Sequence, residues 1–150
     1  MSVILSALGV ASFLAATLLP GGSEVLLVTL QCQQSAPLWA LWAVATCGNV
    51  AGSLVNWAIG RGVARIPATD SGRLGRYHRL AEALFERWGA VVLLLAWVPV
   101  IGDPLTAVAG WAKLPVGRFL FWVGIGKAAR YGIIMAIAIE AGCGVGMGVQ

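Results

Sequence analysis

Two carboxylates interrupt otherwise apolar stretches of the chain, and each follows a proline at the same spacing. Glu24 comes four residues after Pro20, and Asp103 comes four residues after Pro99. In hydrocarbon surroundings an ionisable side chain costs about 2.5 kcal/mol or more unless it is paired or faces a wet cavity, so each acid is a candidate functional site. The residues that break the chain beside the two acids are Pro20, Gly21, Gly22, Pro99, Gly102 and Pro104.

Two cations, Lys127 and Arg130, interrupt another apolar stretch about three turns after its start at Val116. They lie too deep in it for their charged ends to reach a membrane surface easily. Their expected partners are Asp103, Glu24 or an anionic ligand. A carboxylate that faces such cations can bind and release a proton as its partner moves. The alternative is a structural ion pair, but desolvation offsets most of the attraction in a buried pair, so a functional role explains these charges better.

A third set of residues, Asn49, Gly52, Ser53 and Asn56, recurs at intervals of three and four and therefore shares one helical face. Such a stripe either contributes to a binding site or packs closely against another helix, with Asn forming interhelical hydrogen bonds. The sequence leaves both interpretations open. The breaks at the prolines would also expose helix N-termini, whose free N–H groups suit a phosphate.

The composition indicates a membrane rather than water as the solvent of these residues. The 150 residues are 59% hydrophobic and 11% charged, with a mean hydropathy of +0.87. Soluble domains are about 25% charged. The chain can supply about four to six membrane segments, and we predict one membrane domain over residues 1–150. Met1–Leu19 has no basic segment typical of a signal sequence, and we expect it to be retained.

Two full spans and two interrupted pairs of short helices are expected to position the polar residues. A Pro-Gly-Gly sequence ends the first short segment, because an ordinary helix does not continue through it. Each pair indicates a re-entrant hairpin, whose non-helical tip is tolerated at membrane depth only inside protein or beside a wet cavity. The expected short segments are Val3–Leu19, Glu24–Gln34, Gly89–Val98 and Leu105–Leu114, and the expected spans are Pro37–Gly60 and Val116–Ile139.

Basic residues are concentrated between the two expected spans. Seven of the ten Lys and Arg residues lie there and an eighth, Arg118, is the third residue of the second span, whereas the Gln31–Pro37 turn has none. By the positive-inside rule, residues 61–88 and 113–118 are expected in the cytoplasm. Because a hairpin returns to the side that it entered, a hairpin plus a span makes an odd number of crossings. The second half should therefore be inverted relative to the first.

The predicted fold is an all-α membrane protein, an inverted repeat of a re-entrant hairpin plus a transmembrane helix. Repeat 1 covers about 3–60, a basic linker about 61–88, and repeat 2 about 89–140. An apolar stripe over residues 72–88 predicts an amphipathic interfacial helix, either on the membrane surface or packed on the domain as an ordinary charged helix. Inverted repeats with broken helices near the midplane are typical of transporters.

Several classes of function lack sequence support. The chain has no HExxH motif and no nucleophile with a histidine base, so no enzymatic activity is expected. Anionic headgroups explain the basic stretch, and no nucleic acid is expected as a partner. No cofactor or metal is expected either, since Cys32, Cys47 and Cys143 lack the short paired spacings of a metal site. We expect these cysteines to be small buried hydrophobic residues.

Five sequence blocks between residues 20 and 132 resemble the DedA family, also called the VTT or SNARE-associated Golgi protein family. The arrangement is most similar to the small YqaA-like branch. The blocks are Pro20-x-x-Ser23-Glu24, Gly48-Asn49-x-x-Gly52-x-x-x-Asn56-Trp57-x-x-Gly60-Arg61, Phe85-x-Arg87-Trp88-Gly89, Trp97-x-Pro99-x-Ile101-Gly102-Asp103-Pro104 with Ala109-Gly110, and Gly126-Lys127-x-x-Arg130-Tyr131.

The resemblance implies two opposed re-entrant hairpins and movement of lipids across a bilayer. Members of the family are associated with translocation of undecaprenyl phosphate, flipping or scrambling of phospholipids, and proton-motive-force and envelope homeostasis. The family's hairpin acid corresponds to Glu24, and the arginine after its glycine-rich span corresponds to Arg61. Larger members usually have an arginine on each side of the second hairpin proline, where this chain has Trp97 and Asp103. Lys127 and Arg130 would then have to hold a lipid phosphate, or the chain moves another substrate.

The leading expectation is a transporter of the prokaryotic cytoplasmic membrane that flips or scrambles a phosphate-bearing lipid, with proton coupling as an option. One alternative is a proton- or cation-coupled transporter of a small soluble solute. Another is a non-transporting scaffold or assembly factor. The expected partners are membrane lipids with an anionic headgroup or a lipid-linked phosphate, and the small size is compatible with a homodimer.

Overall fold

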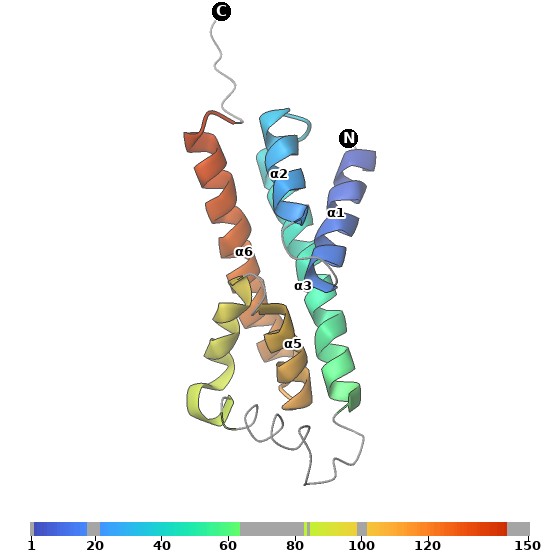
Figure 1. Cartoon of the computed structure of the whole chain (residues 1–150), viewed down its shortest axis with the longest axis vertical. Coiled ribbons are helices and arrows are strands. Elements are labelled where there is room, and N and C mark those ends of the chain that lie inside the picture. The colour runs from blue at the N-terminus through green and yellow to red at the C-terminus, as the bar shows by residue number, and fades with distance from the viewer. Residues whose placement is uncertain (1, 18–21, 64–82, 84, 99–101, 144–150) are drawn as a thin grey trace, which may run out of the picture. The chain divides into compact units, whose positions relative to one another are not determined.

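The structure, a computed structural model, describes residues 2–17, 22–63, 83, 85–98 and 102–143, and every element in them is a helix. This confirms the predicted all-α class. Pro20, Gly21 and Pro99, together with most of the expected amphipathic linker, lie outside the described residues. The elements are α1 (Ser2–Thr17), α2 (Gly22–Cys32), α3 (Leu38–Val63), η1 (Gly89–Trp97), α5 (Gly102–Trp111) and α6 (Val116–Glu140), drawn in Figure 1.

The chain divides into two compact units that contain equivalent sets of helices. Unit 1 comprises residues 1–52 and 127–150, and unit 2 comprises residues 53–126. The boundary therefore falls inside both α3 and α6. Each unit contains one pair of short helices, the N-terminal part of the long helix that follows this pair, and the C-terminal part of the other long helix.

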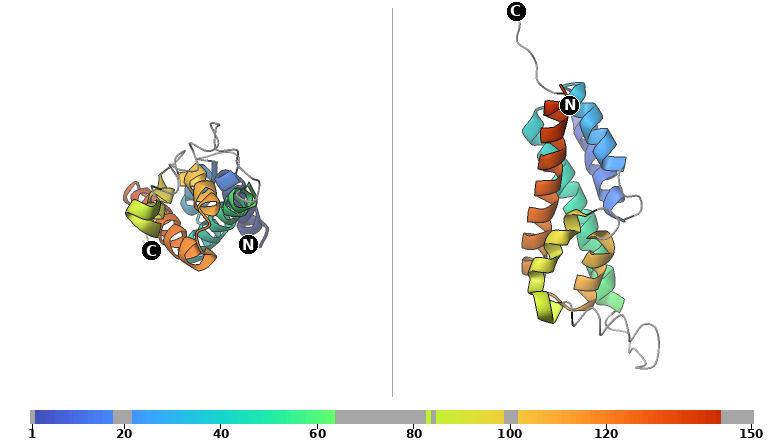
Figure 2. Two further views of the ribbon diagram at one scale, coloured as in Figure 1. Left: turned by 90° about the horizontal axis from the view of Figure 1, so that it is seen from below. Right: turned by 60° about the vertical axis from the view of Figure 1, so that its left-hand side comes forward.

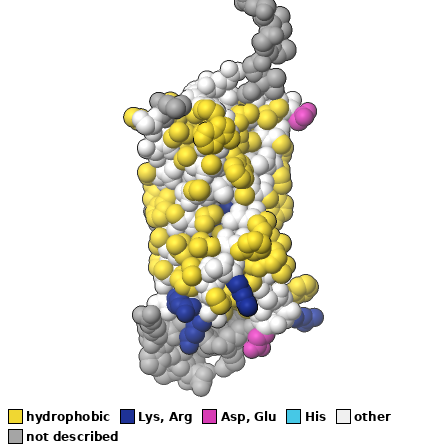
Figure 3. Space-filling view, turned by 180° about the vertical axis from the view of Figure 1, so that it is seen from behind, with side chains coloured by type: hydrophobic (Ala, Val, Ile, Leu, Met, Phe, Trp, Pro, Cys, Tyr) yellow, Lys and Arg dark blue, Asp and Glu magenta, His cyan; other side chains and the backbone are white. Residues whose placement is uncertain are grey.

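The two long helices, α3 and α6, are both long and apolar enough to cross a membrane. Their bounds lie close to the predicted spans. Large hydrophobic side chains on them are exposed, with Trp39 73% and Ile137 64% exposed. Hydrophobic side chains also cover much of the face drawn in Figure 3. Exposed apolar surface of this extent is unusual for a protein in water and is expected for one in contact with lipid.

In unit 1, α1 and α2 form an antiparallel pair, which Figure 1 and the right-hand view of Figure 2 both show. Their apolar residues Leu8 and Leu27 are fully buried in one cluster with Leu41 of α3 and Tyr131 of α6. Small residues allow α1 and α3 to approach closely, because a Cβ at Gly48 would lie 2.5 Å from the backbone oxygen of Gly9.

In unit 2, η1 and α5 form the second pair of short helices. Leu93, Leu105 and Phe119 are buried in a cluster formed by η1, α5 and α6. The contact between α3 and α5 uses glycine on both sides. A Cβ at Gly60 would overlap the carbonyl oxygen of Ala107, and a Cβ at Gly110 would overlap that of Trp57.

The first helix of the second pair is a 3₁₀-helix over nine residues, Gly89–Trp97. It begins at a glycine with φ of +61°. Such runs rarely exceed about four residues, because side chains eclipse and hydrogen-bond geometry is poorer than in an α-helix. The sequence predicts a short helical segment over these residues, but its apolar pattern does not indicate the 3₁₀ form. Its counterpart α1 is α-helical over 16 residues.

The turns that end α2 and α5 have the same hydrogen bonds at an offset of 113 − 34 = 79 residues. Gln34 (φ 50°) and Lys113 (φ 57°) are the non-glycine residues with positive φ in the described chain. Around them the bonds Gln34 N–H to Gln31 O and Ser35 N–H to Leu30 O correspond to Lys113 N–H to Gly110 O and Leu114 N–H to Ala109 O. Both turns are Schellman motifs. The same offset relates Pro20 to Pro99 and Glu24 to Asp103.

Candidate functional site

Glu24 and Arg130 form an ion pair within unit 1, and a guanidinium N–H of Arg130 donates to Glu24 Oε1. Glu24 lies in the first turn of α2, which starts at Gly22, and a carboxylate is favoured there by the helix dipole. The Arg130 side chain is 11% exposed and the Glu24 side chain 27%. The pair is thus mostly buried, but both side chains remain partly exposed.

A neutral hydrogen bond lies next to the ion pair. The hydroxyls of Ser23 and Tyr131 are 2.9 Å apart, and both residues are buried. Ser23 precedes Glu24 on α2, and Tyr131 follows Arg130 on α6. Two consecutive residues of each helix therefore fix the position of the N-terminal turn of α2 against α6.

Lys127 lies one helical turn before Arg130 on α6 and is 1% exposed. Unit 1 contains four charged residues, and the fourth, Glu140, is exposed at the end of α6. Glu24, Lys127 and Arg130 thus place one carboxylate and two cations within the helices of unit 1.

Asn49 has a packing role in the structure. Its side-chain N–H₂ donates to the carbonyl oxygen of Ser12 at 3.0 Å, and the residue is 4% exposed. Gly52 lies against the backbone of Phe13 in the same way. These contacts favour the close-packing interpretation for the unit 1 part of the stripe. Asn56 belongs to unit 2 and is half-buried.

Asp103 is the second residue of α5 in unit 2 and is half-buried. Gly102 starts the helix in close contact with the backbone of Ala96, where a Cβ would clash. Pro104 follows in the first turn, a position at which proline needs no backbone N–H partner. The Thr106 hydroxyl donates to the backbone oxygen of Asp103 at 2.6 Å, which supports this turn.

Arg61 lies near the end of α3 and stacks on Trp57 one turn earlier, with its guanidinium carbon 5.2 Å from the ring centroid. This is a cation–π contact. One terminal nitrogen of Arg61 is buried without a hydrogen-bond partner among the described residues. Trp57 itself donates its indole N–H to the backbone oxygen of Leu114 at 3.2 Å. The Trp57 ring therefore orients Arg61 near the C-terminal end of α3.

Comparison with known proteins identifies the family of the chain. The model of the VTT domain matches residues 19–139. The chain belongs to the VTT-domain, or DedA, family. It is 40% identical over 129 residues to the inner membrane protein YqaA of Escherichia coli, covering 86% of this chain and 87% of that protein.

Two further relatives of this VTT-domain protein are bacterial. It is 36% identical to an uncharacterized protein of Haemophilus influenzae, over 81% of this chain and 79% of the relative. It is 34% identical to an alkaline phosphatase-like protein of Lactococcus lactis, over 65% of this chain and 50% of that protein. No solved structure matches it. Family membership and the two apolar helices make the chain a membrane protein.

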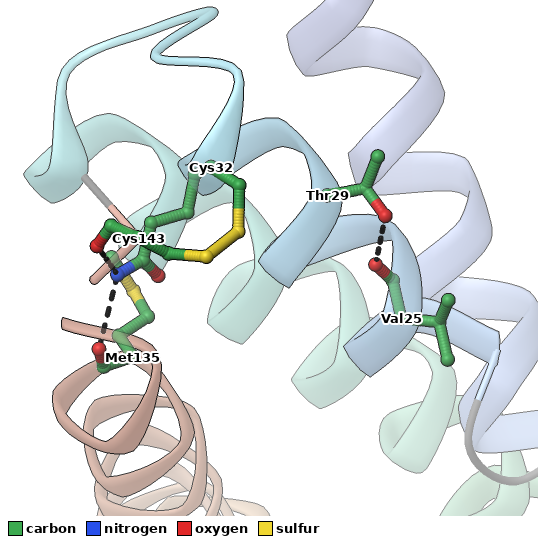
Figure 4. Close-up of a disulfide and its surroundings, with 6 residues drawn as sticks. Val25, Thr29, Cys32, Met135 and Cys143 are labelled. Carbon is green, nitrogen blue, oxygen red and sulfur yellow. Dashed lines mark hydrogen bonds between the residues drawn. A yellow bond between two sulfur atoms is a disulfide. The ribbon is translucent and has the colours of Figure 1, made fainter. Parts of the chain in front are cut away.

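The expectation for the cysteines of this VTT-domain protein is wrong. Cys32 and Cys143 form a disulfide (Figure 4). Cys47 is free and exposed. The pairing was not visible from the sequence because 111 residues separate the partners. In the described residues no group of three His, Cys, Asp or Glu side chains could hold a metal.

Gln31 is a second feature that the motifs did not reveal. It is fully buried, and its side-chain N–H₂ donates to the backbone oxygens of Met135 at 3.0 Å and Cys143 at 3.4 Å. The sequence does show Gln31 as a polar residue in the apolar part of α2, which indicates a buried hydrogen bond. Its partner could not be inferred, because a side chain bonded to backbone oxygens on a distant helix leaves no complementary residue in the sequence.

Proposed function

We propose that this VTT-domain protein flips or scrambles a phosphate-bearing lipid across the cytoplasmic membrane, with Arg130 and Lys127 as the phosphate-binding cations. The observation that supports this most strongly is the Glu24–Arg130 ion pair, with a buried lysine one turn away. The lipid is undecaprenyl phosphate or a phospholipid, since both present a phosphate on an apolar anchor.

An exchange of Glu24 for a phosphate would let Arg130 bind the lipid. Among the described residues Arg130 pairs with the carboxylate of Glu24, and a guanidinium can also bind a phosphate through two parallel N–H donors. A phosphate group that replaces Glu24 keeps the arginine paired during transfer, so the charge of the arginine stays compensated in the membrane. Lys127 adds the second cation that a doubly charged phosphate requires.

A proton on Glu24 would favour this exchange. Protonation removes the negative charge that holds Arg130, and it also lowers the cost of leaving the carboxyl group in apolar surroundings. Loss of the proton restores the pair and displaces the phosphate. Protonation of Glu24 would thereby couple lipid movement to a proton gradient.

The proposed architecture is an inverted repeat of two re-entrant hairpins, α1–α2 and η1–α5. The identical Schellman turns at a spacing of 79 residues support a duplicated unit. The matching composition of the two compact units gives independent support. Asp103 would then be the counterpart of Glu24 in the second hairpin.

The proposed orientation places residues 61–88 and 113–118 in the cytoplasm. Four described basic residues belong to the ends of the helical segments of unit 2: Arg61, Arg87, Lys113 and Arg118. The helix ends of unit 1 at Ser2, Cys32, Leu38 and Glu140 have no Lys or Arg beside them. This asymmetry is the one that the positive-inside rule uses.

The test is transbilayer movement of labelled undecaprenyl-phosphate analogue and labelled phospholipids in proteoliposomes. We expect Glu24→Gln and Arg130→Gln each to slow transfer by at least about tenfold, equivalent to about 1.4 kcal/mol of lost stabilisation. Glu140→Gln and Arg118→Gln are the matched controls, because these residues are exposed at the ends of α6. They should transfer lipid at the wild-type rate.

The outcomes separate the candidate functions. A folded wild type that moves neither lipid contradicts the proposal. Solute-dependent charge movement in the same vesicles would then indicate the coupled solute transporter. If Glu24→Gln lowers only thermal stability, and no flux is measurable in any variant, the scaffold function is favoured.

A further inference from the structure

The disulfide between Cys32 and Cys143 joins two points of unit 1 that are far apart in the chain. Cys32 is the last residue of α2, and Cys143 is the third residue after the end of α6. Figure 4 shows the bond between the two helix ends, beside the backbone of Met135. It therefore attaches the C-terminal end of the α1–α2 pair to the C-terminal end of α6.

The backbone around Cys143 positions this residue for the bond. The last turn of α6 closes in a third Schellman motif, in which Gly142 N–H bonds to Ile139 O and Cys143 N–H to Ala138 O. Gly142 has φ of +91°, a conformation that glycine adopts without steric cost. Residues 141–143 therefore form a hydrogen-bonded turn directly after α6.

Gln31 holds the same two segments together beside the disulfide. Its buried side chain bonds to the backbone oxygens of Met135 and of Cys143 itself. The cysteines are thus brought together by a hydrogen-bonded turn on one side and a buried amide on the other. This arrangement is a built pairing site rather than a chance approach of two exposed thiols.

The charge pattern assigns a compartment to this site. No Lys or Arg lies within ten residues of Cys143 or within twenty-five of Cys32 in the sequence. The positive-inside rule places such helix ends outside the cytoplasm. Disulfides persist in the bacterial periplasm and are rare in the cytosol, where thiols are kept reduced. Charge distribution and cysteine chemistry are independent, and both indicate the extracytoplasmic side.

We propose that Cys32 and Cys143 are oxidised on the extracytoplasmic side by a protein dithiol–disulfide oxidant, which makes this chain a substrate of that class of enzyme. The exposed Cys32 thiolate attacks the oxidant's disulfide and releases one of its sulfurs as a thiol. The Cys143 thiolate then attacks the Cys32 sulfur and releases the second oxidant thiol. Two electrons and two protons pass to the oxidant, and one disulfide forms in this chain.

The experiment measures the thiols directly in a bacterial host, in a Cys47→Ser chain that retains both partners. Acid-quenched cells are treated with a polyethylene-glycol maleimide before and after reduction. We expect no added mass before reduction and two additions after it. In a host without its extracytoplasmic dithiol oxidant, most chains should gain two polyethylene-glycol maleimides without reduction. A membrane-impermeant maleimide, added first to spheroplasts of this host, should react with both cysteines and block this gain.

Three results would overturn the proposal. Free thiols in the wild-type host would show that the pair is not oxidised in cells. A disulfide that forms equally in the host without the oxidant would remove the enzyme from the pathway. Thiols that react with the impermeant reagent only after the membrane is permeabilised would place the site in the cytoplasm. None of these readouts depends on lipid movement, so they are separate from the failure of the proposed function.

Discussion

At the N-terminal turn of α2, the contact with α6 includes two adjacent bonded pairs of different character. Ser23 and Tyr131 are neutral and buried, whereas Glu24 and Arg130 are charged and partly exposed. The neutral pair can hold the two helices in register while the charged pair opens. This arrangement fits the proposed anion exchange, in which the charged residues would change partners without loss of the helix contact.

The ion pair should be energetically coupled. We expect Glu24→Gln to lower the free energy of unfolding by about 1–3 kcal/mol, because it leaves a largely buried guanidinium without its counter-charge. The double variant with Arg130→Gln should lose less than the sum of the two single variants. Thermal unfolding in detergent measures this cycle, and additive losses would contradict a direct pair.

The neutral pair should affect stability more than transport. Tyr131→Phe keeps the buried ring and removes one hydrogen bond, so we expect a loss of about 1 kcal/mol in the free energy of unfolding. Ser23→Ala should have a similar effect. Lipid transfer per folded molecule should change less than twofold. A Tyr131→Phe protein of normal stability that no longer transfers lipid would assign the hydroxyl to substrate binding.

At the scale of residues, the sequence predicted part of the site. Glu24 and Arg130 stood out because charge in apolar sequence is conspicuous, and Glu24 was one of three expected partners of the arginine. The roles of these residues remain predictions. Gln31 and the cysteine pair were not predicted, since apolar sequence tolerates both residue types and nothing local identifies their distant partners.

At the scale of elements, glycine sets how closely helices approach. Gly60 of α3 and Gly110 of α5 each face a backbone carbonyl of the other helix. Such contacts exclude even a methyl group. They fix the α3–α5 contact of unit 2, which also includes the Trp57 hydrogen bond to the turn after α5.

Two glycines on the same helix should respond in opposite ways to alanine. We expect Gly60→Ala to lower the free energy of unfolding by about 1–3 kcal/mol, because the new methyl group forces α3 and α5 apart. Gly62 has nothing within 4 Å of its Cβ position, so Gly62→Ala should be neutral or stabilising by up to about 1 kcal/mol through helix propensity. Thermal unfolding in detergent compares the two, and equal effects would refute the close contact.

The elements themselves were predicted well where long apolar runs end at prolines, glycines or charges. The two spans agree with α3 and α6 to within a few residues. The 3₁₀ form of η1 was not predicted, because a run of uniformly apolar residues has no periodicity that distinguishes it from an α-helix. The correspondence of the turns at Gln34 and Lys113 was also hidden, since neither is a glycine.

At the scale of the whole molecule, the proposed inversion predicts opposite accessibility for the turn after α2 and for the start of α6, which follows the equivalent turn after α5. In a Cys47→Ser chain, the disulfide leaves no other free thiol, so single cysteines can be added. We expect Gln33→Cys to react with a membrane-impermeant maleimide in spheroplasts, and Gly117→Cys to react only after permeabilisation. Both positions are exposed. Labelling of both from the same side would contradict the inverted repeat.

The 3₁₀-helix gives the pair of short helices in unit 2 a property that the pair in unit 1 lacks. Nine residues extend about 18 Å as a 3₁₀-helix but about 13.5 Å as an α-helix. Rewinding η1 would therefore shorten it by about 4.5 Å, nearly one α-helical turn, with every covalent bond intact. It would also rotate each successive side chain by 100° instead of 120°, so a residue eight positions along would turn by about 160°. The η1–α5 pair could thus change in length and rotation by rewinding, whereas α1 is already wound as an α-helix.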